Sequence, residues 1–345
     1  MPPRRAPKGG GRWARIVPAV TAMVALGMAG IGGTYAAFTS TAQNAGNEVA
    51  AASDFRAPSV AAGVIARSGG SLAGFVKQAG AYRVYALVAA DTGNPATGVG
   101  TVTADVSAVT AAGTAVPLLA GSYSVDGASY NYRSAELVAN PLLSEGSKPF
   151  SVTATDNASN SATLAGLSVM VDNTAPSASD VQAADSGGGT AGRPQAGDTM
   201  TLTFSEPIDP ATILSGWGGG STNVVARMTN GGLLGLGNDD VEIRNAAGSA
   251  ALPLGRVDLG RSDYIGGLLG GETVSFGATG TPSTMAMSGN ELTITLGSAS
   301  GSGSVLTAAG NGTAAWTPSA TPTDRAGNLS STATADEAGA ADKEF

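Results

Sequence analysis

Cysteine and histidine are both absent from this chain of 345 residues. Without histidine the chain cannot build a Ser-His-Asp triad or a His-bearing zinc site, and it lacks the usual general base near neutral pH. Without cysteine it has no disulfide, no thiol nucleophile and no iron–sulfur cluster. Because the most common catalytic groups are missing, the sequence predicts a protein that is not an enzyme.

Aromatic and charged residues are also scarce, at 5% and 13%, whereas hydrophobic residues make up 42% of the chain. So high a hydrophobic share argues against disorder throughout. Ala and Val are the most frequent hydrophobic residues, and glycine occurs 51 times. Small and β-branched residues favour thin β-sheet layers over a thick helical core, so we expect an all-β fold.

The start of the chain has the three zones of an export signal, in the usual order. Five basic residues come first, an apolar run extends from Ile16 to about Gly33, and the small-residue site Thr34-Tyr35-Ala36 ends it. The basic residues are Arg4, Arg5, Lys8, Arg12 and Arg15. We therefore expect residues 1–36 to be a signal peptide that is cleaved between Ala36 and Ala37.

The alternative is a retained membrane anchor, because residues 16–38 are 23 uncharged residues and long enough to span a bilayer. Pro18 and four glycines in this run weaken such a helix, which favours cleavage. In both cases the bulk of the chain is expected outside the cell or at its surface. The membrane is then a partner only through this segment, if it stays uncleaved.

Removal of residues 1–36 takes away five of the 18 basic residues and none of the 26 acidic ones, which leaves a net charge of −13. Nucleic acid is therefore not expected as a partner, because its phosphates would repel the exported part. The expected partners are components of the cell surface or matrix. The sequence does not predict an oligomeric state.

Residues 33–41, Gly-Thr-Tyr-Ala-Ala-Phe-Thr-Ser-Thr, together with Gly46-Asn47, resemble the signal region of camelysin-type and biofilm-matrix fibre proteins. In that family a Gly-Thr-aromatic-Ala core precedes the cleavage site, and a phenylalanine opens the mature chain. The resemblance implies export. The metalloprotease activity attached to the family needs a histidine pair, which this chain does not have.

Beyond residue 57 the hydrophobic residues alternate with the period of two that is typical of β-strands. Strands are expected at 82–88, 100–106, 122–125, 129–132, 150–155, 165–171, 199–204, 224–228, 241–243, 272–276 and 291–296. Asp126-Gly127 predicts a tight hairpin, and Asp209 with Pro210 predicts one capped helical turn. Short strands separated by turn signals indicate β-sandwiches.

Two features divide this β region in two. Asp172-Asn173-Thr174-Ala175-Pro176 predicts a domain junction, after which strand patterning is expected to resume only beyond residue 197. The turn motif at 155–160, Thr-Asp-Asn-Ala-Ser-Asn, recurs at 323–328 as Thr-Asp-Arg-Ala-Gly-Asn. The predicted organisation is a flexible lead-in at 37–57, a β-sandwich at 58–174 and a second, larger β-sandwich at 175–345.

The junction and the two turn motifs resemble those of bacterial Ig-like repeat proteins. Residues 202–209, Leu-Thr-Phe-Ser-Glu-Pro-Ile-Asp, are similar to an early strand and loop of Ig-like domains in surface-layer proteins. The resemblance implies two Ig-like domains. With the export signal, it leads to the expectation of a non-enzymatic secreted or cell-surface protein with a structural or adhesive function.

Calcium is the one cofactor that the acidic turns suggest, because this hard ion needs several oxygen ligands at once and acidic turns can supply them. Extracellular Ig-like chains often hold such ions at domain junctions, so Asp156 and Asp172 are expected to share one if calcium binds. The simpler alternative is that each Asp only accepts hydrogen bonds within its own turn, and no cofactor is then needed. Other acids in loop-like segments are Asp91, Asp239, Asp240 and Asp324.

Two other functions remain as alternatives. A carbohydrate- or matrix-binding module would show an exposed aromatic row, for which the only cluster is Tyr123, Tyr130 and Tyr132, while Trp217 is either an exposed ligand contact or a core residue. A glycosidase would use two carboxylates, and Glu206 and Asp209 are the nearest candidates. The Pro207 turn between them favours simple solvation, so no catalytic residue is predicted.

Overall fold

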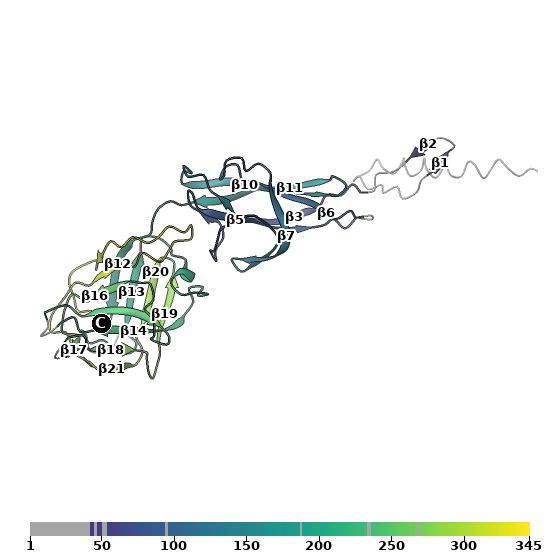
Figure 1. Ribbon diagram of the computed structural model, residues 1–345. Coiled ribbons are helices and arrows are strands. Elements are labelled where there is room, and N and C mark those ends of the chain that lie inside the picture. Colours follow the sequence, from purple (N-terminus) through teal and green to yellow (C-terminus); the bar gives the residue numbers. More distant parts are fainter. Residues whose placement is uncertain are drawn as a thin grey trace, which may run out of the picture.

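The computed structural model describes residues 42–44, 47–49, 54–93, 96–186, 188–232, 236–267 and 270–345. The predicted signal peptide, its cleavage site at Ala36 and Ala37, and the alternative anchor at 16–38 lie outside these residues. Within them every regular element is a β-strand, apart from one 3-10 turn. The prediction of an all-β, sandwich-like fold is confirmed, and the strands form two bodies that follow one another along the chain (Figure 1).

The N-terminal sandwich, residues 54–171, contains one large sheet with the strand order β3-β5-β8-β7-β6-β10-β11-β4, and β9 pairs with β5. The two strands β3 and β11 lie far apart in this order yet pack against each other, so the sheet folds over its own core (Figure 1). The strands are β3 Ser59–Arg67, β4 Phe75–Val76, β5 Ala81–Ala89, β6 Val99–Asp105, β7 Val116–Val125, β8 Ala128–Ser134, β9 Leu137–Val138, β10 Gly146–Asp156 and β11 Ser161–Val171.

Alternating burial explains why these segments form strands. In β10 the side chains of Phe150, Val152 and Ala154 point into the core, while the residues between them are only partly buried. The expected hairpin is also present, because Val125 pairs with Ala128 across the two-residue turn Asp126-Gly127. Both turn residues have positive φ, 52° and 70°, and such turns match the twist of the flanking strands.

The C-terminal sandwich, residues 176–345, contains a second large sheet with the order β12-β13-β20-β19-β14-β15-β16-β23-β24; β18 also pairs with β14, and β21 pairs with β18. A small sheet of β17 and β22 lies beside it. The strands are β12 Ala178–Ala184, β13 Thr199–Phe204, β14 Thr222–Thr229, β15 Asp240–Asn245, β16 Arg256–Asp258, β17 Ile265–Gly266, β18 Thr273–Phe276, β19 Ser283–Ser288, β20 Glu291–Thr295, β21 Ala299–Gly301, β22 Ser304–Val305, β23 Ala315–Thr317 and β24 Ala335–Asp336.

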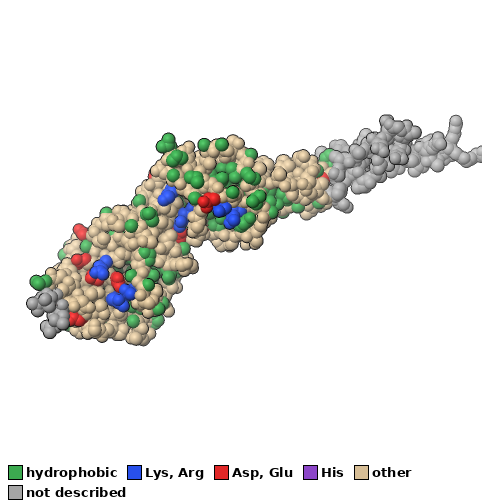
Figure 2. All heavy atoms as spheres, in the orientation of Figure 1, with side chains coloured by type: hydrophobic (Ala, Val, Ile, Leu, Met, Phe, Trp, Pro, Cys, Tyr) green, Lys and Arg blue, Asp and Glu red, His purple; other side chains and the backbone are tan. Residues whose placement is uncertain are grey.

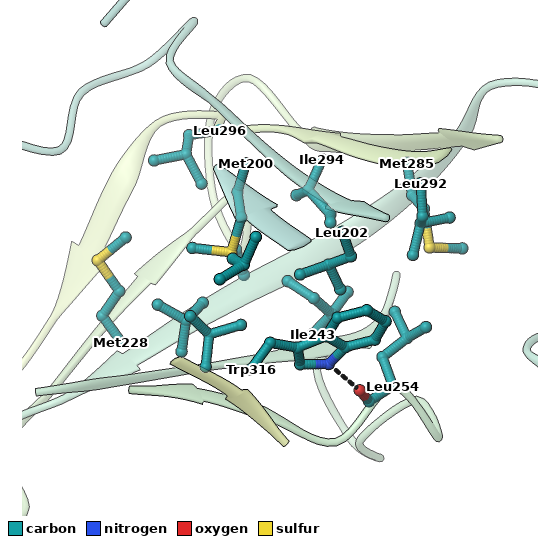
Figure 3. Close-up of a cluster of buried hydrophobic side chains, with 14 of the residues drawn as sticks. Met200, Leu202, Met228, Ile243, Leu254, Met285, Leu292, Ile294, Leu296 and Trp316 are labelled. Carbon is teal, nitrogen blue, oxygen red and sulfur yellow. Dashed lines mark hydrogen bonds between the residues drawn. The ribbon is translucent and has the colours of Figure 1, made fainter. Parts of the chain in front are cut away.

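Trp316 lies at the centre of the C-terminal core (Figure 3). Its side chain is fully buried, its indole nitrogen donates a 2.8 Å hydrogen bond to the carbonyl oxygen of Leu254, and its ring meets Phe204 edge to face at 4.8 Å. Methionine, leucine and isoleucine side chains from several strands surround it in Figure 3. This core is separate from that of the N-terminal sandwich.

One expectation near the start of the C-terminal sandwich is wrong. Strand patterning does not wait until residue 197, because β12 pairs along β13 and buries Val181. Asp54, within the predicted lead-in, is only 7% exposed, and its carboxylate accepts hydrogen bonds from the backbone N–H groups of Arg56 and Thr97. Further upstream, β1 Ala42–Asn44 and β2 Asn47–Val49 form a short antiparallel hairpin.

The two sandwiches contact each other through the end of β3 and the loops of the C-terminal sandwich. The Arg67 guanidinium lies 2.6 Å from the carboxylate of Asp209, which is 1% exposed and also accepts a hydrogen bond from Ser71. Lys77 donates to the Gly327 carbonyl oxygen at 2.6 Å. Asp209 also caps the 3-10 turn Pro210–Thr212, as predicted, so one carboxylate serves the turn and the contact between the sandwiches.

Candidate cation sites at the ends of the two sandwiches

The repeated turn motif builds the same hydrogen-bonded turn in both sandwiches. In the first copy, one Asp156 oxygen accepts the backbone N–H groups of Ala158 and Asn160, both at 2.8 Å. The Asn160 amide donates to the other Asp156 oxygen at 2.8 Å and to the backbone oxygen of Asp54 at 3.2 Å. The turn is therefore tied to the segment that leads into the N-terminal sandwich.

The second copy makes a closely similar set of contacts. One Asp324 oxygen accepts from the backbone N–H groups of Gly327 and Asn328, at 2.6 and 2.8 Å. The Asn328 amide donates to the other Asp324 oxygen at 2.7 Å and to the backbone oxygen of Asp172 at 2.9 Å. Asp172 thus corresponds to Asp54, and each begins the same short motif, Asp-x-x-Ala-Pro, just before the first strand of its sandwich.

A third acid completes each arrangement. Asp91 comes two residues after β5, and Glu206 comes two residues after β13. The strands β5 and β13 are equivalent, because each pairs antiparallel with the first strand of its sandwich. Carboxylate oxygens within 4.8 Å of one another therefore gather in a first cluster, Asp54, Asp91 and Asp156, and in a junction cluster, Asp172, Glu206 and Asp324.

The junction cluster concentrates acidic groups at a partly buried place. No ion pair joins its three acids to a lysine or arginine in the described part of the chain. Burial, together with the charges of Asp172 and Asp324, raises the pKa of Glu206 to about 7. Burial also raises the pKa of Asp324. Ionisation of all three groups therefore costs free energy, because the charges are partly buried and repel one another.

Both clusters fit a hard cation. Asp91 Oδ2 and Glu206 Oε1 are buried oxygens without a hydrogen-bond partner, so each cluster keeps an unused acceptor next to two other carboxylates. Sets of carboxylate oxygens are the ligands that calcium prefers, whereas zinc and copper sites usually contain nitrogen or sulfur. Asp54, Asp91 and Asp156 would hold one ion, and Asp172, Glu206 and Asp324 another.

The expected pairing of Asp156 with Asp172 is wrong. Asp156 ends β10, and Asp172 follows β11 directly, but these strands are antiparallel, with Thr155 opposite Ser161 and Gly146 opposite Val171. The two acids therefore lie at opposite ends of the N-terminal sandwich and belong to different clusters. The alternative, that each Asp builds a local turn, describes the hydrogen bonds of Asp156 correctly but leaves the neighbouring acids unexplained.

The structure also separates the two carboxylates considered for glycoside hydrolysis. Glu206 belongs to the junction cluster, whereas Asp209 is buried against Arg67 and caps a turn. Trp217 is a core residue, 8% exposed, with its indole nitrogen bonded to the Gly220 carbonyl oxygen. Asp209 and Trp217 are therefore both buried.

The three tyrosines do not form an exposed row. Tyr130 is 8% exposed and packs against Tyr85, and the Tyr123 ring meets Tyr85 edge to face and is covered by the Arg133 guanidinium. Tyr132 packs against the main core of the N-terminal sandwich. The arrangement expected for a sugar-binding platform is therefore not present at these residues.

The remaining acidic candidates are occupied. The fully buried Asp239 carboxylate accepts backbone N–H bonds from Gly231, Tyr264 and Ile265, and Asp240 pairs with Arg256 at 2.9 Å. On the face shown in Figure 2, lysine and arginine side chains are few and lie beside Asp and Glu, so no expanse of positive charge occurs there.

Comparison of the chain with models of protein families, with curated proteins and with solved structures finds no match. Within the described ranges, no helix has the length and hydrophobicity needed to cross a membrane. The candidate sites are therefore inferred from the geometry of this chain and from its internal repetition. Asp54 was not predicted from the sequence, and Glu206 was predicted only as a candidate for catalysis. The repeated Asp-x-x-Ala-Pro motif is the signal that could have identified Asp54 as the counterpart of Asp172.

Proposed function

We propose that this chain is a non-enzymatic structural or adhesive protein that is exported and acts at the cell surface or in the surrounding matrix, and that calcium stiffens the joint between its two sandwiches. The observation that carries the proposal is the junction cluster. Asp172 belongs to the connecting segment, and Glu206 and Asp324 belong to loops of the C-terminal sandwich. One ion at these acids holds the connection against the second sandwich.

The surroundings of the joint support this function. Asn173 accepts a hydrogen bond from the Gln78 backbone and donates one to the Leu143 carbonyl oxygen, so the connection is also held by the N-terminal sandwich. The buried pair of Arg67 and Asp209 bridges the sandwiches directly. Two sandwiches that are held end to end by such contacts are suited to bear mechanical force or to present a binding surface away from the point of attachment.

Calcium is expected to narrow the range of orientations between the sandwiches. Because the chain has no cysteine, the double variant Leu119→Cys/Ala247→Cys places one spin label on an exposed position of each sandwich. Pulsed dipolar spectroscopy should give a narrow distance distribution in calcium and a broader one in chelator. An ion at 100 times its dissociation constant also adds roughly 2.7 kcal/mol to the stability of the state that binds it.

The variant Glu206→Gln tests the cluster itself, since it removes one charge and leaves the Asp324 turn intact. It should abolish the narrowing by calcium, whereas Glu291→Gln, an exposed acid in β20, should not. If the distances between the spin labels are distributed equally narrowly in calcium and in chelator when Glu206 is present, calcium does not control the orientation of the sandwiches. The joint would then be held without calcium, by direct contacts such as the pair of Arg67 and Asp209.

Export is tested independently. N-terminal sequencing of the protein recovered outside the cell should begin close to Ala37, because the basic, apolar and small-residue zones precede that position in the order that signal peptidase requires. A membrane-bound product that still carries Arg4 would instead support the anchored alternative. A product confined to the cytoplasm would contradict a surface function.

A further inference from the structure

A third group of acids lies in the segment that follows β24 and shares no residue with the joint. Carboxylate oxygens of Glu337, Asp342 and Glu344 come within 4.8 Å of one another. Glu337 is 8% exposed, and one of its oxygens accepts a 3.3 Å hydrogen bond from the Ala314 backbone. Asp342 is exposed at the edge of the group, and its backbone oxygen accepts from Gly312. We call these three acids the terminal cluster.

Glu344 makes this cluster different from an ordinary acidic surface. Its side chain is 0% exposed, and neither of its two carboxylate oxygens has a hydrogen-bond partner among the described residues. Its backbone nitrogen donates to the buried hydroxyl of Tyr264 at 2.8 Å, which fixes the main chain at this point. A buried carboxylate normally accepts several hydrogen bonds or pairs with a cation, because burial of a bare charge is very costly.

The positive groups nearby do not supply that pairing. No lysine or arginine in the described part of the chain forms an ion pair with Glu337, Asp342 or Glu344. Arg261, whose guanidinium bonds the Asn311 carbonyl oxygen close by, is held by both carboxylate oxygens of Asp263. The unpartnered oxygens of Glu344 therefore face two further carboxylates.

We propose that Glu337, Asp342 and Glu344 bind a hard divalent cation, calcium by preference, that fastens residues 337–345 to the C-terminal sandwich. Three carboxylates, one of them exposed at the mouth, give an all-oxygen ligand set with a route for the ion to enter. Phe345, fully buried against Tyr264, anchors the same segment by hydrophobic packing. The ion and the aromatic contact together hold this segment in place.

This site does not depend on the proposed function, because it shares no residue with the joint. The competing explanation is a proton shared between Glu337 and Glu344. Burial and the neighbouring Glu337 raise the pKa of Glu344 to about 8, so the ion-free pair retains a proton near neutral pH. A cation and a shared proton are distinguished by their response to calcium at constant pH.

The experiment compares the full chain with Glu344→Gln and Asp342→Asn by calorimetric calcium titration and by thermal melting in calcium and in chelator. Each variant should bind one calcium ion fewer per chain than the unmodified protein. At 100 times the dissociation constant, calcium should raise the melting temperature of the unmodified C-terminal sandwich by about 5–10 °C more than it raises that of either variant. In chelator, Glu344→Gln should melt at or above the unmodified protein, because the buried carboxyl group, which must hold a proton when no ion is bound, is replaced by an amide that is always neutral.

Asp336→Asn is the matched control, since Asp336 is exposed, lies next to Glu337 and is not in the cluster. It should bind as many calcium ions as the unmodified protein. If Glu344→Gln and Asp342→Asn also keep the full number of calcium ions, the cation site is refuted and the shared proton is the correct account. Asp342→Asn covers the case in which Glu344→Gln does not fold, because an exposed Asp is not needed for packing. Loss of joint stiffening in Glu206→Gln would leave this result unaffected.

Discussion

Replacement of Trp316 by alanine is expected to lower the free energy of unfolding of the C-terminal sandwich by about 3–5 kcal/mol. Three losses add together at this position. The fully buried ring leaves a cavity, the Phe204 ring loses its edge-to-face partner, and the Leu254 carbonyl oxygen loses the indole donor. Urea unfolding followed by far-UV circular dichroism measures the change in both sandwiches.

Two further variants separate these losses. Trp316→Phe keeps most of the packing but leaves the buried Leu254 oxygen without its donor, so it should cost about 1–3 kcal/mol. Leu329→Ala truncates a side chain of the same sandwich that is 59% exposed and should stay within about 0.5 kcal/mol of the unmodified protein. If Trp316→Ala and Leu329→Ala change the free energy of unfolding by the same small amount, the burial of Trp316 does not stabilise the C-terminal sandwich.

The second large effect is expected at Asp209. Asp209→Ala should cost about 3 kcal/mol, because it leaves the mostly buried Arg67 guanidinium without its partner and removes the cap of the 3-10 turn. The same change should broaden the distance distribution between spin labels on the two sandwiches, even in saturating calcium. Both results follow from one carboxylate that serves the turn and the joint.

Arg83→Met provides the comparison. Its partner Glu136 lies 3.6 Å away, and that side chain is 50% exposed, so loss of the pair should cost at most about 1 kcal/mol. It should leave the inter-sandwich distances unchanged, because both residues lie within the N-terminal sandwich. If Asp209→Ala is no more costly than Arg83→Met, the contact across the joint does not stabilise it.

The sequence predicted the strands whose hydrophobic residues alternate clearly, such as β13, whose bounds of Thr199–Phe204 match the expectation. It missed β12 and β3, which are rich in alanine and carry little contrast between buried and exposed positions. Their pairing with β13 and β5 decides their conformation, and that pairing is a tertiary effect.

The acid clusters were harder to predict for a related reason. Asp156 and Asp324 are visible as a repeated turn, but their partners Asp54 and Asp172 precede them by more than 100 residues in the chain. Only the order of the strands shows that the loop after β5 or β13 meets that turn. Glu344 carries no motif at all, and its burial follows from the way residues 337–345 fold back onto the sandwich.

The directions of β3 and β11 have a mechanical consequence. β3 starts at the first cluster and ends at Arg67 beside Asp209, while β11 ends just before Asp172 at the same joint. A force that stretches the chain would pull the start of β3 and the end of β11 in opposite directions along their own axes. The β3–β5 and β10–β11 ladders would then be loaded in shear, so many hydrogen bonds must break at once instead of opening one after another.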